Sequence, residues 1–305
     1  MADIGVLVPH EEGIEALADV AGVTAVRYDP DGELPAQAAT AQVLVPPFLA
    51  TTEMVEMTAR LPALRLVQLL SAGAENWVGR LPAGVALADC RGAHGGATAE
   101  WIVATLLAVY RHLPGFVHAQ AQARWDYHET EELTGKRVLL VGAGDVAENT
   151  VRRLAPFEVT TTLVGRRARE GVHGIDEVHD LLPDHDAAVV VVPLTDETHG
   201  LVDAAFLAAM SDGAVLVNAA RGPVVDTEAL TAELGSGRLR AAVDVTDPEP
   251  LPADHPLWRV PGLLLTPHVG GSVPGGMHRA YRVAAGQIAA FTRGERPPNL
   301  VENGY

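Results

Sequence analysis

The sequence contains very few residues of several types on which common chemistries depend. It has one cysteine, Cys90, which excludes an internal disulfide and a cysteine-based zinc or iron–sulfur site. It has one lysine, Lys136, and no G-x-x-x-x-G-K-[ST] loop. These absences argue against pyridoxal-phosphate chemistry and against phosphoryl transfer on a P-loop.

Positive charge is scarce as well. The 22 Lys and Arg residues stand against 39 Asp and Glu, which gives a net charge of −17. Because such a field repels phosphate backbones and anionic lipids, we expect neither nucleic acid nor a membrane as a partner. The longest uncharged apolar run, Trp101–Tyr110, is too short to cross a bilayer, and no basic leader opens the chain. Together with the cysteine count, this predicts a cytoplasmic protein.

The 305 residues, 48% of them hydrophobic, suffice for two domains. Short β-branched runs alternate with helical stretches along the whole chain, and many of these runs are continuously apolar, which is typical of parallel strands covered on both faces. We therefore predict two doubly wound α/β sheets. Glycine-rich breaks at RGAHGG and HVGGSVPGG place one domain at 94–273 and the other at 1–93 with 274–305.

A glycine-rich turn follows one of the predicted strands. Gly142, Gly144 and Ala147 form the pattern G-x-G-x-x-A between the strand RVLLV and a helix. Gly142 permits a tight turn, and Gly144 lets the backbone approach a pyrophosphate at the start of the helix. The alternative is a turn that merely joins strand to helix. The strand–turn–helix context favours a dinucleotide site.

The end of the next strand indicates which dinucleotide is preferred. An NAD site usually has a carboxylate there for the ribose 2′-hydroxyl, but this chain has Arg166 and Arg167, with Arg169 close behind. Guanidinium groups bind a 2′-phosphate through charge-assisted hydrogen bonds, so we predict that NADP(H) is preferred over NAD(H). The alternative is a solvated basic loop.

Three later segments carry a resemblance to a known family. They are VNAARGPVVD with Arg221, DVTDPEPLP with Glu249 and LLLTPHVGGS with His268. In this order they resemble the D-isomer-specific 2-hydroxyacid dehydrogenases, and most of all the glyoxylate/hydroxypyruvate reductase branch. The resemblance implies a Rossmann-type cofactor domain inserted in a flavodoxin-like substrate domain.

The resemblance also implies roles for these three residues. Arg221 would bind the substrate carboxylate and polarise the 2-oxo group. His268 would give a proton to the carbonyl oxygen, and Glu249 would accept a hydrogen bond from the other imidazole nitrogen. Taken singly, each has an ordinary alternative as a strand cap, a solvated acid or a surface histidine. All three follow predicted parallel strands, at the edge where α/β sheets bind ligands.

Further positions match the family pattern. Ala72 and Gly73 would hold the substrate carboxylate through backbone N–H groups. Trp101 stands where the family usually has histidine. The remaining coenzyme contacts would be Asp145, Val146, Val192, Pro193, Ala219, Asp244 and Gly270.

The predicted function is the NADPH-dependent reduction of a small 2-oxo acid to its D-2-hydroxy acid. Two rivals remain: a dehydrogenase of another small anion such as phosphite, and a dinucleotide-sensing protein without catalysis. The family also implies a homodimer, with the helix that contains Trp101–Tyr110 at the contact. His and Asp residues gather at 179–186, but their spacing is not that of a metal site, so we predict no metal.

Overall fold

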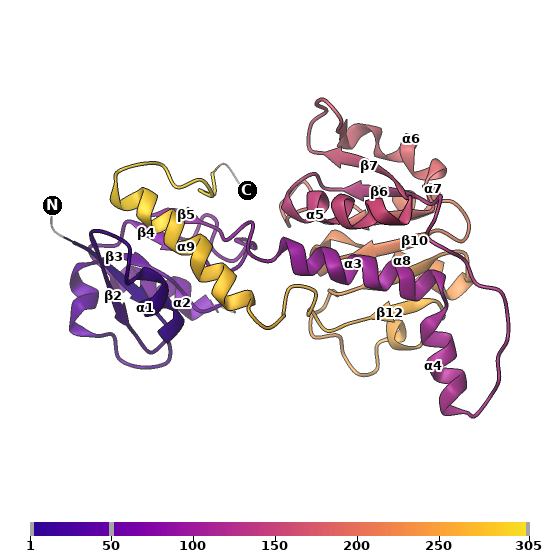
Figure 1. The fold of residues 1–305 in the computed structure, drawn as a ribbon, viewed down its shortest axis with the longest axis horizontal. Coiled ribbons are helices and arrows are strands. Elements are labelled where there is room, and N and C mark those ends of the chain that lie inside the picture. The colour runs from indigo at the N-terminus through magenta and orange to yellow at the C-terminus, as the bar shows by residue number, and fades with distance from the viewer. Residues whose placement is uncertain (1–2, 49–51, 303–305) are drawn as a thin grey trace. The chain divides into compact units, whose positions relative to one another are not determined.

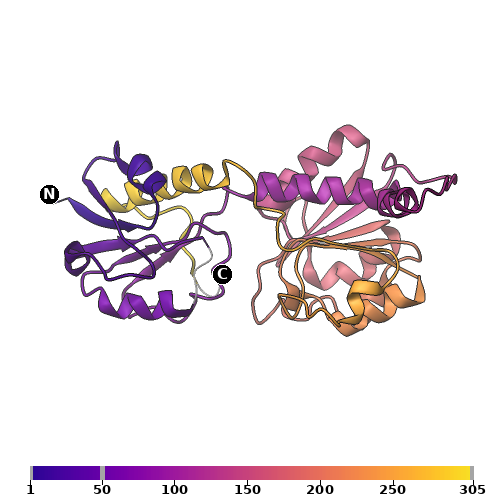
Figure 2. The ribbon, with the colours of Figure 1, turned by 90° about the horizontal axis from the view of Figure 1, so that it is seen from below.

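The computed structural model describes residues 3–48 and 52–302. They form two compact α/β units, one with residues up to His94 and from Pro274 onward, the other with Gly95–Val273 (Figures 1 and 2). Each unit has a parallel sheet with packed apolar clusters on both faces. The predicted fold class, two doubly wound parallel α/β domains, is therefore confirmed.

The first unit has a five-stranded sheet in the order β2-β1-β3-β4-β5, which is the flavodoxin-like order. Its elements are β1 (Ile4–Val8), α1 (Glu11–Leu17), β2 (Val23–Arg27), β3 (Ala41–Leu44), α2 (Thr52–Met57), β4 (Leu66–Gln68), β5 (Ala86–Ala88) and α9 (Gly276–Thr292).

Alternation along β1 builds the two cores of this unit. Leu7 belongs to one apolar cluster, whereas Val6 and Val8 belong to the cluster on the opposite face. Helix α9 contributes its buried residues, Tyr281 and Ile288 among them, to the second cluster. A helix from the end of the chain therefore covers one face of the sheet that the first strands form.

The second unit has a seven-stranded sheet in the order β12-β11-β10-β9-β6-β7-β8. Read from β8, this is the Rossmann order 3-2-1-4-5-6 with one further strand, and its switch point lies between β6 and β9. Its elements are α3 (Gly95–Tyr110), α4 (Leu113–Ala121), β6 (Arg137–Val141), α5 (Asp145–Leu154), β7 (Thr160–Gly165), β8 (His173–Gly174), α6 (Val178–Leu181), β9 (Ala187–Val190), α7 (Ala204–Ala209), β10 (Val215–Asn218), α8 (Thr227–Ser236), β11 (Arg240–Val243) and β12 (Leu263–Leu265).

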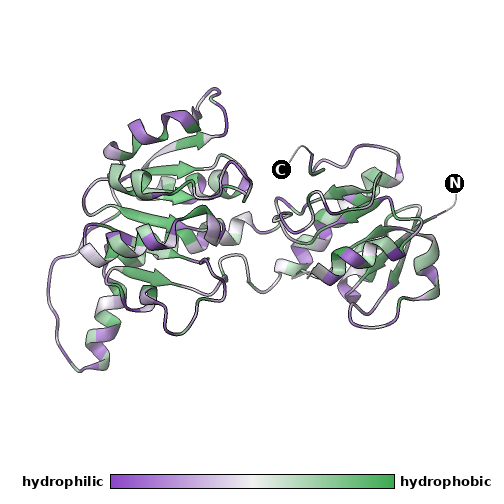
Figure 3. Cartoon of the chain, turned by 180° about the vertical axis from the view of Figure 1, so that it is seen from behind, coloured by the Kyte–Doolittle hydropathy of each residue, from purple (hydrophilic) through white to green (hydrophobic). Residues whose placement is uncertain are grey.

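In strands β6, β9 and β10 the residues are apolar except for Arg137 at one end and Asn218 at another, as suits a sheet that is covered on both faces (Figure 3). In β6, Leu139 faces one cluster and Leu140 the other. Helix α3 buries Ile102 and Leu106 against the second of these clusters, so the run Trp101–Tyr110 is a core helix. Within the described residues, no single helix is long and apolar enough to cross a bilayer, and α3 and α4, which pass that test only as a pair, are bent by 63°.

Candidate active site

Arg221, Glu249 and His268 follow three neighbouring strands of the second sheet. Arg221 lies just after β10, Glu249 in the connection after β11, and His268 just after β12. Because β10, β11 and β12 are adjacent and parallel, all three residues start from the same edge of the sheet. The geometry that the sequence implied for this edge is thus present in the strand order.

His268 and Glu249 form the central pair of this edge. The Nδ1 atom of His268 lies 2.7 Å from Oε1 of Glu249, and the two side chains are 45% and 41% exposed. With Glu249 ionised, Nδ1 carries the hydrogen that it donates, which leaves Nε2 available to another group. His268 adopts the left-handed conformation, with φ of 55°.

A buried carboxylate holds the backbone around His268 in that conformation. Asp244, at the end of β11, is 5% exposed. Its Oδ1 accepts hydrogen bonds from the Thr266 hydroxyl (2.6 Å) and the Val269 N–H (2.9 Å), and its Oδ2 accepts one from the Gly270 N–H (2.7 Å). Its carbonyl accepts a further bond from the His268 N–H at 2.7 Å. Asp244 therefore fixes the segment on both sides of the histidine.

The segment that carries Arg221 is fixed in a similar way. The buried side chain of Asn218 accepts from the Ala220 N–H (3.0 Å) and donates to the Arg221 carbonyl (3.1 Å). One guanidinium nitrogen of Arg221 donates to the Ala220 carbonyl at 2.7 Å. A Cβ at Gly222 would collide with the carbonyl of Thr246, so only glycine permits this approach of two loops.

The glycine turn after β6 has the geometry of an anion site. Gly142 has φ of 123°, and a Cβ there would lie 2.8 Å from the Val191 carbonyl oxygen. Gly144 precedes the first residue of α5, and a Cβ on Gly144 would meet nothing within 4 Å. The turn therefore leaves open space in front of the free N–H groups of the helix. These residues fit the pyrophosphate of a dinucleotide.

The arginines after β7 are exposed and border this turn. Arg166 pairs with Glu197 at 2.6 Å, and Arg169 donates to the Ala143 carbonyl at 3.1 Å. The other predicted coenzyme positions lie after the carboxyl ends of β9, β10, β11 and β12 or on the first turn of α5. They are Asp145, Val146, Val192, Pro193, Ala219, Asp244 and Gly270.

Two of the coenzyme positions have their polar groups engaged within the chain. The Asp145 carboxylate accepts from the Asn149 side chain at 3.0 Å, and a Cβ at Gly95 would collide with it. All of the hydrogen bonds described above for the Asp244 carboxylate come from residues 266–270. Contact of either carboxylate with a coenzyme stays a prediction.

Ala72 and Gly73 belong to the first unit, where they follow β4. The Ser71 hydroxyl closes this turn with a hydrogen bond to the Gly73 carbonyl at 2.8 Å. Their contact with the carboxylate that Arg221 would bind stays a prediction.

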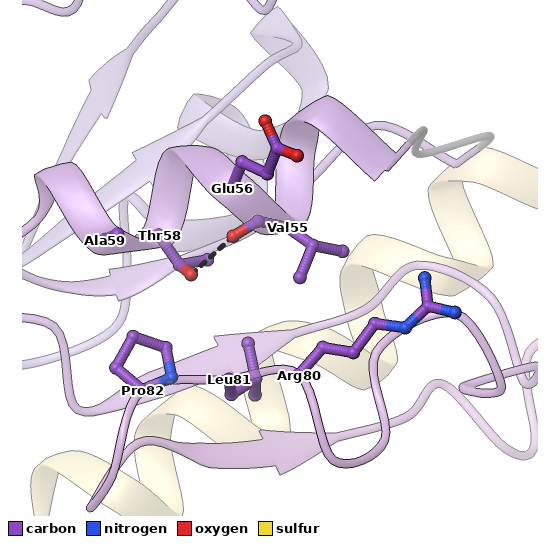
Figure 4. A pocket seen from close by; sticks show the side chains of 7 residues that line it. All are labelled: Val55, Glu56, Thr58, Ala59, Arg80, Leu81 and Pro82. Carbon is purple, nitrogen blue, oxygen red and sulfur yellow. Dashed lines mark hydrogen bonds between the residues drawn. The ribbon is translucent and has the colours of Figure 1, made fainter.

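A cavity of about 450 Å³ lies elsewhere in the first unit, and Figure 4 shows its lining between residues 55–59, in α2 and just after it, and residues 80–82. Its charged side chains, Glu56 and Arg80, are exposed, and the Thr58 hydroxyl is bonded to the Val55 carbonyl at 2.6 Å. It contains none of the predicted site residues. We assign it no function.

The histidine and aspartate residues at 179–186 serve the fold in the structure. His185 is buried and bonds through Nδ1 to the Leu181 carbonyl (2.7 Å) and through Nε2 to the Thr162 hydroxyl (2.9 Å). The Asp186 carboxylate accepts the Arg137 N–H at 2.7 Å. Across residues 3–48 and 52–302, no group of three or more acidic, histidine or cysteine side chains has the arrangement of a metal site.

Sequence reasoning missed several residues that organise this edge. Asn218 and Thr266 close the loops that carry Arg221 and His268, and a signal existed for Asn218, which is a polar residue at the end of an apolar strand. Glu197 gave no signal, because it reaches Arg166 from 31 residues further along the chain.

Comparison with known proteins identifies the family to which the chain is similar. Residues 103–270 match the family model for the NAD binding domain of D-isomer specific 2-hydroxyacid dehydrogenases. The chain is 36% identical over 218 residues to a glyoxylate reductase of Thermofilum pendens, which covers 67% of this chain and 64% of that protein. It is 33% identical over 214 residues to the glyoxylate reductase/hydroxypyruvate reductase of Homo sapiens, which covers 66% and 65%. The match thus spans slightly less than two thirds of each of these relatives.

A solved structure resembles nearly the whole chain. The crystal structure of a D-isomer specific 2-hydroxyacid dehydrogenase from Xanthobacter autotrophicus, in complex with NADPH and MES, aligns with a TM-score of 0.85 and 29% identity. The alignment covers 99% of this chain and 98% of that one.

Proposed function

The chain belongs to the D-isomer specific 2-hydroxyacid dehydrogenase family, and from this we propose that it is an enzyme that reduces a small 2-oxo acid to the D-2-hydroxy acid with NADPH. Glyoxylate and hydroxypyruvate are the proposed substrates, since both curated relatives named above are glyoxylate reductases. The observation that carries the proposal is the 2.7 Å pair of His268 and Glu249, which follow β12 and β11, at the same sheet edge as Arg221 after β10.

In this proposal His268 moves the proton. Glu249 accepts the hydrogen on Nδ1, which fixes the ring orientation and directs Nε2 to the substrate. Reduction requires a hydrogen on Nε2 that passes to the carbonyl oxygen, and the reverse reaction requires Nε2 to be free to accept it. Reduction is therefore carried out by the imidazolium form and oxidation by the neutral form.

Arg221 binds the other end of the substrate. A guanidinium has five N–H donors in one plane, and one of its nitrogens is engaged by the Ala220 carbonyl. The planar fork matches a carboxylate with two parallel hydrogen bonds, which the point charge of a lysine does not reproduce. Arg221 thus holds the acid group and orients the adjacent carbonyl carbon.

The dinucleotide, when bound, supplies the hydride. Gly142 and Gly144 would hold its pyrophosphate at the start of α5, and Arg166 and Arg167 would meet the 2′-phosphate of NADP(H). The relative from Xanthobacter autotrophicus, whose crystal structure contains NADPH, supports this assignment by similarity.

We further propose that the chain forms a homodimer. The family implied a contact through the helix of Trp101–Tyr110, and this contact stays a prediction; Ile102 and Leu106 of α3 pack in its own unit, while Ala104 is exposed. A group of exposed apolar side chains lies on α4 and the segment after it, which project from the second unit in Figure 1 and offer a second candidate contact. Val117, Trp125 and Tyr127 are 66%, 94% and 86% exposed there. Light scattering should give twice 32.1 kDa for the wild type, and a Trp125→Ser, Tyr127→Ser variant should be monomeric.

A substrate panel tests the enzymatic proposal. Purified protein is mixed with NADPH and glyoxylate, hydroxypyruvate or pyruvate, and with NADP⁺ or NAD⁺ and phosphite or formate, while the nicotinamide absorbance is followed. We expect turnover with a 2-oxo acid. Turnover with phosphite alone would identify a different dehydrogenase, and dinucleotide binding without any turnover would identify a sensing protein.

The composition still predicts a cytoplasmic protein.

Two variants test the residue roles. His268→Ala should lower kcat by about 10²–10⁴-fold with little change in KM, since general acid catalysis contributes about that much. Arg221→Lys should raise KM and lower kcat together. A variant with unchanged kinetics would remove that residue from the mechanism.

A further inference from the structure

The ion pair of Arg166 with Glu197 lies where the adenosine half of a dinucleotide would bind. Arg166 follows β7, and Glu197 lies in the connection after β9. In the sheet, β7 and β9 are the two neighbours of β6, the strand that leads into the glycine turn. The pair therefore joins the loops on either side of that turn, with Arg166 Nη2 2.6 Å from Glu197 Oε1.

The loop that carries Glu197 is held in one conformation by its own hydrogen bonds. The Thr198 hydroxyl accepts from the Thr195 N–H at 2.8 Å and donates to the Pro193 carbonyl at 2.6 Å. The His199 N–H closes the same turn on the Thr195 carbonyl at 2.9 Å. Glu197 is thus presented by a closed turn next to Pro193, one of the predicted coenzyme positions.

The three arginines after β7 are not equivalent in this arrangement. Arg169 is bonded to the Ala143 carbonyl of the glycine turn, and its N–H pairs with the Val172 carbonyl at 2.9 Å. Arg167 is exposed. Of the three, Arg166 is the arginine whose guanidinium pairs with a carboxylate, that of Glu197. A 2′-phosphate that binds Arg166 would therefore compete with this carboxylate, which is also negatively charged.

We propose that Glu197 is the residue that sets the preference between the two dinucleotides, an inference that rests on the proposed dinucleotide site. Its carboxylate competes with the 2′-phosphate of NADP(H) for Arg166 and repels it. The same carboxylate is an acceptor for the 2′-hydroxyl of NAD(H). A phosphate monoester carries about −1.5 to −2 charges at pH 7, so the repulsion is selective for NADP(H). Glu197 therefore lowers the ratio of NADP(H) affinity to NAD(H) affinity that the arginines alone would produce.

The expected size of the effect follows from exposure. Arg166 and Glu197 are 60% and 61% exposed, so solvent and salt screen their charges strongly. Loss of the Glu197 charge should therefore raise affinity for NADP⁺ by about three- to fivefold, the upper part of what exposed charge pairs contribute, and leave affinity for NAD⁺ unchanged or a few-fold weaker.

The test is a set of calorimetric titrations that need no turnover. Wild type and Glu197→Gln are titrated with NADP⁺ and NAD⁺, and with adenosine 2′,5′-bisphosphate and 5′-AMP, which differ by the 2′-phosphate alone. Asp196→Asn is the matched control, because it removes the same charge from the adjacent exposed residue of the same loop. A combined Arg166→Ala, Glu197→Gln variant tests whether the effect of Glu197→Gln on nucleotide affinity depends on Arg166.

Glu197→Gln should lower the Kd values of NADP⁺ and of the bisphosphate about three- to fivefold. Asp196→Asn should change the ratio of these Kd values to those of NAD⁺ and 5′-AMP by less than about twofold. The gain in affinity for NADP⁺ that Glu197→Gln produces should be smaller when Arg166 is also replaced by alanine. The inference would be overturned if Glu197→Gln changed the Kd values of NADP⁺ and NAD⁺ equally or weakened NADP⁺ binding. It would also be overturned if Glu197→Gln and Asp196→Asn changed these Kd values equally. Absence of binding by the wild type to all four nucleotides would overturn the proposed function instead.

Discussion

Replacement of Asp244 by asparagine should loosen the backbone that presents His268. The buried carboxylate accepts three hydrogen bonds, from the Thr266 hydroxyl and from the backbone N–H groups of Val269 and Gly270. An asparagine side chain has one oxygen in place of two. If that oxygen serves Thr266 and Val269, its amide NH₂ faces the N–H of Gly270, and two donors oppose each other.

The magnitude follows from this count. A hydrogen bond to a charged acceptor contributes about 1.5–3 kcal/mol, and a buried N–H left without an acceptor costs about 1–3 kcal/mol. The two hydrogen bonds that remain, from Thr266 and Val269, are weaker because their acceptor is now a neutral amide oxygen and no longer a carboxylate. We expect a loss of about 3 kcal/mol in the free energy of unfolding of the second unit, or about 6–12 °C in its melting temperature. A displacement of His268 by about 1 Å should lower kcat by roughly 10²-fold.

Three measurements on the same preparation test this expectation. Calorimetry gives the melting temperature, amide hydrogen exchange gives the protection of the Gly270 N–H, and steady-state kinetics gives kcat. Thr266→Val is the matched control, because it removes one donor and leaves both backbone N–H groups bonded to Asp244. Thr266→Val should cost about 1.5 kcal/mol, the lower end of the range for a hydrogen bond to a charged acceptor, and the Gly270 amide should stay protected from exchange. In Asp244→Asn the Gly270 amide should exchange faster.

The reasoning would be refuted by an Asp244→Asn protein that melts within 2 °C of the wild type and protects the Gly270 amide equally, where about 6 °C or more is expected. A Thr266→Val variant as damaged as Asp244→Asn would also contradict it, since the hydroxyl would then matter more than the two backbone bonds.

Three further outcomes are expected. Gly142→Ala should abolish dinucleotide binding in calorimetry and lower the melting temperature, because its Cβ would lie 2.8 Å from the Val191 carbonyl; unchanged binding would contradict the turn geometry. Burial raises the pKa of the Cys90 thiol to about 12, so iodoacetamide at pH 8 should leave the native protein unmodified by mass spectrometry and label it fully in denaturant; rapid native labelling would show that the site opens. Burial acts to raise the pKa of Glu131, but the hydrogen bond from Lys136 and nearby positive charge outweigh it, so the folded pKa lies below the usual 4.5. This pair should add up to about 1 kcal/mol above that pH and lose it as the pH falls through the folded value, and denaturation of Glu131→Gln at pH 7 and pH 4 should show the smaller pH difference.

The parts of the fold that follow from local pattern could be predicted from the sequence. Continuous apolar runs of strand length indicate parallel strands, because both faces of such strands are buried. The glycine turn at Gly142 was recognisable because φ of 123° there permits glycine alone. The edge occupied by Arg221 and His268 follows from the rule that parallel strands end on one side.

The contacts that tune the site could not be predicted, because they join residues distant in sequence through side-chain orientation. Glu197 reaches Arg166 across the end of β6, and only the sheet order reveals that the two loops are neighbours. Asp244 was expected to contact the coenzyme, and its bonds to residues 266–270 depend on the left-handed turn at His268. Sequence periodicity carries no information on either.

The path of the chain imposes an order on biosynthesis. The face of the first sheet that holds Val6 and Val8 is covered by α9, which the ribosome makes only after the whole of residues 95–273. At elongation rates of about 5–20 residues per second, those apolar strands wait roughly 10–40 s for the helix that shields them. During that interval the first 94 residues expose apolar surface of the kind that chaperones bind, whereas the inserted unit contains its own covering helices and is able to fold first.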